Sequence, residues 1–196
     1  MSDEPDLTET PADRRAALLD LLVNRGLVRL DTPVELSSGA RSRYFLDAKK
    51  ALSAGRDLAL ACRCMADLAA DAGIAFDAVG GLTLGADQFA HGIAIVDDAE
   101  WFVVRKQPKG RGTDRFVEGA DLDGKRVLLV DDVITTGGSS LTAKERIVAE
   151  GGKVVLATTL VARSDEPAER FADEDVPFLP VFTYEDLGIP AVGTEG

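Results

Sequence analysis

The stretch VLLVDDVITTGGS, residues 127–139, is the part of this chain from which the fold can be inferred. Its first four residues, Val127–Val130, are apolar and predict a short buried strand. A helix is expected from about Leu141 to Glu150, where a Gly-Gly pair stops it, and a second β-rich run follows at Val154–Val161. The sequence therefore predicts a β-loop-α-β unit. In open α/β sheets, the loop at the carboxyl end of such a strand is where ligands bind.

The loop of this unit carries two adjacent carboxylates, Asp131 and Asp132, where the strand is expected to end. Thr135–Ser139 follow, and small residues of this kind let backbone N–H groups close on a phosphate at the start of a helix. Two neighbouring carboxylates repel each other and add nothing to a plain phosphate cradle. They suit a phosphorylated sugar, because its hydroxyls can donate to the carboxylates while its phosphate lies on the amides. The loop thus predicts a sugar-phosphate site.

A second unusual stretch is the cationic segment RKQPKGRGT, residues 105–113. It holds Arg105, Lys106, Lys109 and Arg111 among glycine and proline, without helical spacing and without an acidic residue inside the segment. Glycine and proline indicate a mobile loop. A polyanionic ligand explains these cations in an acidic protein better than a solvated charge run does.

The remaining segments alternate between helical and β-rich patterns, which predicts an α/β fold. Residues 1–10 are expected to form an acidic flexible tail, and residues 11–196 a single domain. A segment at about 27–50, with two short strands around a Ser-Ser-Gly turn, could form a small hood over the α/β part. Further expected elements are helices at 11–24, 56–72, 88–96 and 168–172, strands at 76–79, 101–104 and 178–182, and a second candidate phosphate loop, GGLTLGAD, at 80–87.

Composition limits the classes of function. The 196 residues are 45% hydrophobic, which argues against disorder, and the net charge of −12 makes nucleic acid an improbable partner. No apolar run reaches the ~20 residues that span a bilayer, and the acidic start is unlike a signal peptide. A cytoplasmic protein without membrane contact is expected. The acidic composition fits both ordinary solubility and a salt-rich cytoplasm, and these alternatives stay open.

Three residues that often carry chemistry are given structural roles. Cys62 and Cys64 are two positions apart on an expected helix and point about 200° from each other, so they suit neither a disulfide nor a shared metal. They are expected to be small buried groups. His91, the only histidine, lacks a Cys or His neighbour and is a poor metal ligand candidate.

The motifs resemble, in order, those of the type I phosphoribosyltransferases, and in particular of the orotate phosphoribosyltransferases. The strand, acidic pair and Thr/Gly loop of residues 127–139 are similar to the family's phosphoribosyl-pyrophosphate signature. Residues 36–51, LSSG…YFLDAKKA, resemble the region where an aromatic strand, here with Tyr44 and Phe45, walls the base pocket. GGLTLGAD resembles the loop that receives pyrophosphate, and residues 105–119 resemble the mobile catalytic loop.

This resemblance implies a type I phosphoribosyltransferase fold, a twisted and mostly parallel sheet flanked by helices with a small N-terminal hood. It implies Mg²⁺-dependent transfer of ribose 5-phosphate from phosphoribosyl pyrophosphate to orotate, giving orotidine 5′-phosphate and pyrophosphate, by a homodimer with shared active sites. The catalytic residues it implies are Lys109, Arg111, Asp131 and Asp132.

The same resemblance assigns roles to individual residues. Asp131 and Asp132 would hold the ribose hydroxyls and water around the metal, and Arg163 would pair with the orotate carboxylate. The amides of Thr135–Ser139 would bind the 5′-phosphate. The substrate-binding set it implies is Arg105, Lys106, Lys109, Asp131, Asp132, Val133, Ile134, Thr135, Thr136, Gly137, Gly138, Ser139 and Arg163.

Three positions depart from the family pattern. Ser37 stands where some members have lysine, Arg111 where histidine is usual, and Ala162 where aspartate is usual. Because arginine keeps its proton at working pH, acid catalysis from position 111 is doubtful. These departures leave open a transferase for another base, such as a purine. A non-catalytic regulator that binds phosphoribosyl pyrophosphate is the other alternative, and the lack of a basic helix-turn-helix extension disfavours it.

Overall fold

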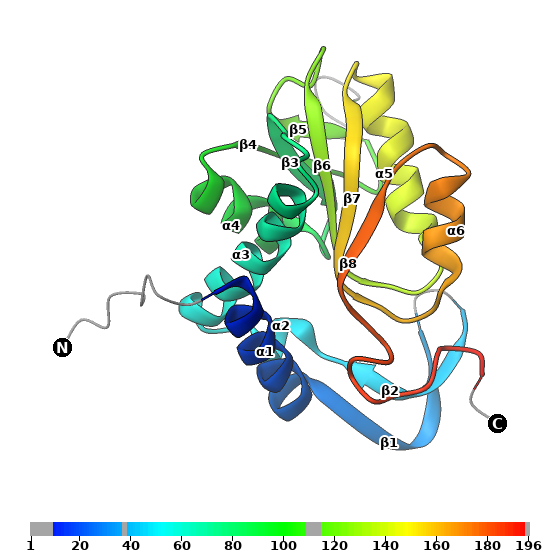
Figure 1. The fold of residues 1–196 in the computed structure, drawn as a ribbon. Helices are drawn as coiled ribbons and strands as arrows, with labels where there is room; N and C mark the ends of the chain where they lie inside the picture. The colour runs from blue at the N-terminus through cyan, green and yellow to red at the C-terminus, as the bar shows by residue number, and fades with distance from the viewer. Residues whose placement is uncertain (1–9, 37–38, 109–114, 195–196) are drawn as a thin grey trace.

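The computed structural model describes residues 10–36, 39–108 and 115–194, and its centre is a six-stranded sheet with the order β5-β4-β3-β6-β7-β8. All neighbouring strands are parallel except β5, which runs antiparallel to β4. The predicted mostly parallel sheet is therefore confirmed (Figure 1). The strands are β3 Ala78–Leu82, β4 Glu100–Val104, β5 Val117–Gly119, β6 Arg126–Ile134, β7 Lys153–Ala162 and β8 Phe178–Thr183.

Helices cover both faces of this sheet (Figure 1). On β6, Leu128 and Val130 belong to the apolar cluster with the helices of one face, while Val127 and Leu129 belong to the cluster of the other face. All four side chains are buried, as expected for a central strand covered on both sides. The first face carries α3 Gly55–Asp71, α4 Asp87–Asp97 and, against α3, α1 Pro11–Leu21; the second carries α5 Gly138–Ala149 and α6 Glu166–Ala172.

A smaller unit, the hood, lies at the carboxyl ends of the parallel strands (Figure 1). It consists of a π-helical turn η1 at Leu22–Gly26, the antiparallel pair β1 Leu27–Glu35 and β2 Arg41–Leu46, and the short helix α2 at Ala48–Ala51. Two buried alanines, Ala48 and Ala51, anchor α2, and the amide of Asp47 donates to the carbonyl of Gly26 at 2.9 Å. The structure has the antiparallel pair β1 and β2 where the sequence predicts two short strands, and the helix α2 was not predicted.

Some element boundaries differ from the sequence prediction. The strand expected to end at Val130 continues to Ile134, because β7 pairs with it as far as Ile134↔Ala162. Helix α5 begins at Gly138 rather than at Leu141, since Gly137 adopts φ +76° and starts the helix despite the low helix propensity of the following small residues. Strand β5 was not predicted.

The described part of the N-terminus starts inside the expected tail. Thr10 forms a capping box with Asp13, so Thr10 belongs to the start of α1. The rest of the expected tail lies outside the described residues.

Both cysteines are free and buried, as predicted, and burial raises the pKa of Cys62 to about 12. No helix in the described ranges is long and apolar enough to span a membrane.

Candidate active site

A cavity of about 980 Å³ opens at the carboxyl ends of β3 and β6. The chain leaves β3 toward β4 on one side and leaves β6 toward β7 on the other, so the two strands flank the point where the strand order reverses. Ligands bind open α/β sheets at such a point. The cavity is lined by Lys49, Leu82, Thr83, Leu84, Gly85, Val103, Arg105, Lys106, Gln107, Glu118 and residues 131–140.

Asp131 is the buried member of the acidic pair. It is 9% exposed and accepts hydrogen bonds from the Ser140 hydroxyl at 2.8 Å and from the Asp132 amide at 2.9 Å. Burial, and then the neighbouring Asp132 carboxylate, raise the pKa of Asp131 above its ordinary value. A carboxylate in this setting gains from a hydroxyl donor or a cation.

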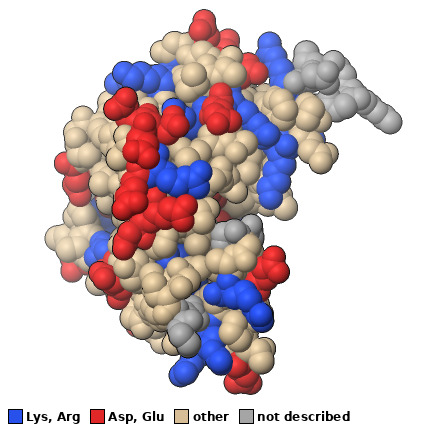
Figure 2. All heavy atoms as spheres, turned by 90° about the vertical axis from the view of Figure 1, so that its right-hand side faces the viewer, with Lys and Arg blue, Asp and Glu red and all other residues tan. Residues whose placement is uncertain are grey.

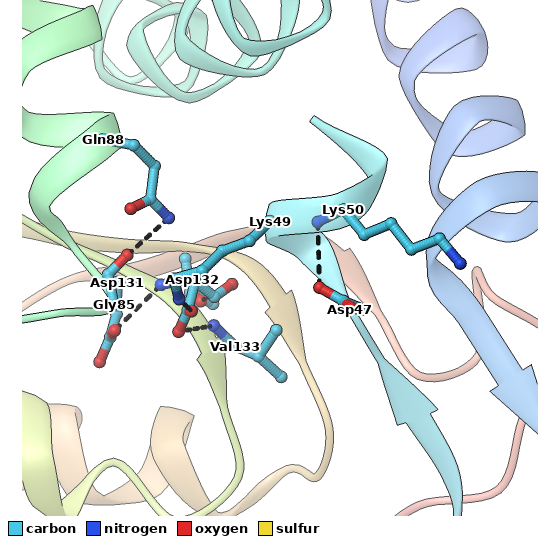
Figure 3. Close-up of polar contacts among 9 residues, drawn as sticks. Asp47, Lys49, Lys50, Gly85, Gln88, Asp131, Asp132 and Val133 are labelled. Carbon is cyan, nitrogen blue, oxygen red and sulfur yellow. Dashed lines mark hydrogen bonds and ion pairs between the residues drawn. The ribbon is translucent and has the colours of Figure 1, made fainter. Parts of the chain in front are cut away.

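Asp132 is the more open member, with a side chain 23% exposed. One of its carboxylate oxygens accepts from the Val133 amide at 2.8 Å, and the other lies 3.0 Å from the ammonium of Lys49. Figure 3 shows Lys49 reaching from α2 of the hood toward this carboxylate. The hood and the acidic pair therefore meet in one ion pair.

Gly85 brings the loop after β3 against both carboxylates. A Cβ atom at this position would lie 2.6 Å from Oδ1 of Asp131 and 2.9 Å from Oδ1 of Asp132, so only glycine fits without moving them. The Gln88 side chain donates to the carbonyl of Gly85 at 2.9 Å and fixes the loop from α4 (Figure 3). Strand β6 and this loop thus converge on one point.

The loop from Thr135 to Gly137 is held from the side of α6. Its carbonyl groups at Thr135 and Thr136 accept from the Ser164 hydroxyl at 2.6 Å and from the Arg170 guanidinium at 2.8 Å. Because C=O and N–H point in opposite directions across a trans peptide, the amides of Thr136 and Gly137 point away from these two partners. The sequence signature thus forms a fixed turn at the start of α5.

The cationic segment begins beside the same cavity. Arg105 and Lys106 line it, and Arg105 pairs with Glu118 of β5 at 2.9 Å, a partner that the sequence prediction missed because it follows the segment. Arg146 of α5 donates to the carbonyl groups of Arg105 and Lys106, and its guanidinium lies 4.1 Å from the centre of the Phe116 ring. Lys109 and Arg111 lie outside the described residues.

Arg163 follows β7 and is only 2% exposed, so it is a buried arginine. Its guanidinium donates to the Tyr44 carbonyl at 3.1 Å and to the Ser42 hydroxyl at 3.2 Å, both in β2 of the hood. It is absent from the described lining of the 980 Å³ cavity.

The structure brings most of the predicted site residues together. Within the described ranges, the cavity lining includes every predicted substrate-binding residue except Arg163. Sequence reasoning missed Lys49, Ser140, Glu118 and Arg146. Ser140 adjoins the signature and could have been assigned from it, whereas the other three contribute through tertiary packing that no local pattern encodes.

The donor set suits a hard cation that takes part of its ligands from elsewhere. In the ranges covered by the structure, no group of three or more His, Cys, Asp or Glu side chains could enclose a metal ion. Asp131 and Asp132 offer carboxylate oxygens only, which Mg²⁺ prefers, and Mg²⁺ commonly combines one or two carboxylates with water and substrate phosphates.

Comparison with known proteins gives the class first. The family model described as "Phosphoribosyl transferase domain" matches residues 50–181. The orotate phosphoribosyltransferase of Corynebacterium glutamicum is 39% identical over 180 residues, covering 91% of this chain and 96% of that protein. The enzyme of the same name from Streptomyces avermitilis is 39% identical over 183 residues, covering 90% and 98%.

Solved structures agree. Mycobacterium tuberculosis orotate phosphoribosyltransferase in complex with Fe(III) dicitrate superposes with a TM-score of 0.76 at 39% identity, covering 90% of this chain and 99% of that one. The same enzyme in complex with phosphoribosyl pyrophosphate gives 0.73 at 38% identity over the same shares. The chain therefore belongs to the orotate phosphoribosyltransferase family. The family and fold predicted from the sequence are confirmed.

Proposed function

We propose that this protein transfers the ribose 5-phosphate group of phosphoribosyl pyrophosphate to N1 of orotate, forming orotidine 5′-phosphate and releasing pyrophosphate. One observation carries the proposal: the acidic pair, the Thr135–Gly137 turn and the first cations of the 105–113 segment line a single cavity. The names of its relatives, and the phosphoribosyl pyrophosphate complex of a similar enzyme, support it.

The acidic pair and the turn would fix the sugar. Asp132, the more exposed carboxylate, and Asp131 behind it would accept hydrogen bonds from the ribose 2′- and 3′-hydroxyls. The amides of Thr135–Ser139 would bind the 5′-phosphate at the start of α5, where the helix dipole favours negative charge. Binding at both ends orients C1 toward the base, and orientation of this kind supplies a large share of a transferase's rate acceleration.

Bond breaking places positive charge on the ribose ring and negative charge on the departing pyrophosphate. The carboxylates would lie near the first charge, and Arg105 and Lys106, which line the cavity, would lie near the second. We propose that Lys109 and Arg111, outside the described residues, complete this cationic cover. Arg111 would act by its charge alone, because it cannot serve as a proton donor at working pH.

We propose Mg²⁺ as the cofactor. Asp131 and Asp132 would hold it, mostly through water and substrate oxygens. When bound, it would neutralise pyrophosphate charge and so favour departure of this group. The protein's own share is to present two oriented carboxylates and to keep their geometry through Ser140 and Val133.

For the base, we propose that Arg163 pairs with the orotate carboxylate, as the resemblance implies. Its position between β7 and the hood, with hydrogen bonds to Ser42 and Tyr44, supports a role at the boundary of the two units.

The direct test follows orotate absorbance in the presence of phosphoribosyl pyrophosphate and Mg²⁺. Wild-type protein should consume orotate, and Asp131→Asn/Asp132→Asn protein should lose about a hundredfold or more of the rate, as when charge-stabilising groups are removed elsewhere. A panel of purines is the control. Turnover with a purine and not with orotate would contradict the proposed base.

We also propose a homodimer in which the 105–113 segment of one subunit closes over the site of its partner. A mixed dimer tests this: Lys109→Ala subunits are combined with Asp131→Asn/Asp132→Asn subunits. Recovery of activity on mixing is expected, because one hybrid site is then intact. No recovery after verified subunit exchange would contradict the sharing of active sites.

We propose a cytoplasmic location, because the charged sugar phosphates that the protein uses do not cross bilayers.

A further inference from the structure

The loop that should receive pyrophosphate has no cation of its own. Residues 80–87, GGLTLGAD, contain neither lysine nor arginine, and the Leu82–Gly85 part of them lines the cavity. A diphosphate carries several negative charges, so backbone amides alone leave much of its charge uncompensated. Arg105 and Lys106 supply cations from the end of β4, and a further cation on the side of the hood would add to them.

Lys49 of the hood is placed to supply it. Its ammonium lies 3.0 Å from Oδ2 of Asp132, while Gly85 of the loop packs against the other oxygen of the same carboxylate. Lys49 and the Leu82–Gly85 loop line the same cavity. The ammonium and the loop therefore approach one carboxylate from two sides.

The backbone at Lys49 is held in place, whereas its side chain is largely open to solvent. The side chains of Ala48 and Ala51 are buried and anchor α2. The Asp47 side chain caps this helix by accepting a hydrogen bond from the Lys50 amide at 3.0 Å. The Lys49 side chain itself is 56% exposed. Ion pairs exposed to this degree are weak, so an incoming diphosphate can compete with Asp132 for the ammonium.

We propose that Lys49 is a substrate-binding residue for the pyrophosphate group. In the free protein it neutralises Asp132, and when phosphoribosyl pyrophosphate binds, its ammonium donates a hydrogen bond to the diphosphate. The proposal rests on the proposed function. It assigns to the hood a direct contact with the leaving group, in addition to any contact with the base.

The chain provides a matched control in Lys50, the next residue on the same helix. Figure 3 shows the Lys50 side chain directed away from the carboxylates, toward α1. Lys49→Met and Lys50→Met remove the same charge from the same element, so they have equal effects on net charge and on helix propensity. Only the first removes an ammonium from the cavity. Lys49→Arg retains a cation and serves as a rescue.

The experiment measures binding by calorimetry, with Mg²⁺ present, of two ligands that differ by the diphosphate: phosphoribosyl pyrophosphate and ribose 5-phosphate. We expect Lys49→Met to lower the affinity for phosphoribosyl pyrophosphate about tenfold or more, because one charge-assisted hydrogen bond is lost. The affinity for ribose 5-phosphate should change little. Lys49→Arg should recover most of the loss, and Lys50→Met should match wild type.

Two results would overturn the proposal. An equal loss of affinity for both ligands in Lys49→Met would show that Lys49 acts only by positioning Asp132. Unchanged affinity for both ligands would show that Lys49 contacts neither of them. Failure of the proposed function looks different, because wild-type protein would then not consume orotate in the absorbance assay, whatever its affinity for phosphoribosyl pyrophosphate.

Discussion

At the scale of single residues, neighbouring aspartates in one strand acquire different properties from their surroundings. Asp131 is enclosed and hydrogen-bonded to Ser140, whereas Asp132 meets Lys49 and the open cavity. Sequence predicts that two carboxylates lie here, and it cannot say which one is buried, because that depends on Gly85 and Ser140 arriving from other elements. The difference has measurable consequences.

The first consequence is a dependence of stability on pH. The pKa of Asp131 is raised from 3.8 to about 7 in the folded protein, so its ionised form is disfavoured by folding. Its contribution to stability is therefore complete below pH 3.8 and is lost as the pH rises through about 7. The Asp131→Asn variant has no carboxyl group at this position and does not lose this stability. The difference in free energy of unfolding, variant minus wild type, should therefore increase by at least about 1 kcal/mol from pH 5 to pH 8.

Urea unfolding of both proteins at the two pH values measures this. Comparing the pair at each pH cancels the titration of those carboxylates that do not interact with Asp131. A difference between variant and wild type that stays constant from pH 5 to pH 8 would contradict the assignment of Asp131 as the buried, protonation-sensitive member.

The second residue-scale prediction concerns Gly85. An added methyl group must displace one or both carboxylates, and misplacement of reacting groups by a fraction of an ångström to 1 Å costs about tenfold to a hundredfold in rate. Gly85→Ala should therefore lower kcat/KM for orotate while the thermal midpoint changes little. Gly55→Ala is the control, because nothing lies within 4 Å of its added methyl group. Equal kinetics for the two variants would refute this role of Gly85.

At the scale of elements, the sequence predicted what local pattern and spacing determine. The central β-loop-α-β unit, the helices on both faces and the hood strands follow from apolar runs and turn residues. The two missed elements, β5 and α2, have three and four residues and exist through their partners: β5 pairs with β4, and α2 packs under η1. The extension of β6 through both aspartates likewise depends on pairing with β7.

Arg146 connects two functional elements and gives the prediction at this scale. From α5, which begins after the Thr135–Gly137 turn, it donates to two carbonyl groups at the start of the cationic segment and lies over the ring of Phe116, three residues beyond its end. Arg146→Met should lower stability by about 1–3 kcal/mol, from the lost hydrogen bonds and cation–π contact, and should lower kcat more than it affects ribose 5-phosphate binding.

Lys144→Met on the same helix is the control, since Lys144 pairs with Glu174, away from the cavity. Chemical denaturation and steady-state kinetics measure both quantities. If the two variants lose activity equally, Arg146 has no particular role in holding the segment.

At the scale of the whole molecule, two units meet over one cavity. Arg163 and Lys49 both link the hood to the sheet, and Lys49 brings a residue from a distant part of the sequence into the cavity. The contact between the hood and the acidic pair could not be predicted from the sequence. The KK pair at 49–50 is visible in the sequence, but only the fold shows which lysine faces the carboxylates. We propose that residues 11–196 unfold as one unit.

The net charge belongs to the same scale. Figure 2 shows acidic side chains gathered in a band on the face that carries α6, with basic side chains on another part of that face. With a net charge of −12, mutual repulsion destabilises the folded chain, and salt screens it. The thermal midpoint should therefore rise between about 0.05 M and 1 M KCl, and an unchanged or lower midpoint would contradict this.

The central claim is that the acidic pair holds the ribose hydroxyls while the adjoining turn holds the 5′-phosphate. Calorimetric titration of phosphoribosyl pyrophosphate with Mg²⁺ into wild-type and Asp131→Asn/Asp132→Asn protein tests it most directly. We predict saturable binding to wild type and a loss of affinity of about a hundredfold in the double variant, the equivalent of two charge-assisted hydrogen bonds. The same affinity in both proteins would contradict the account.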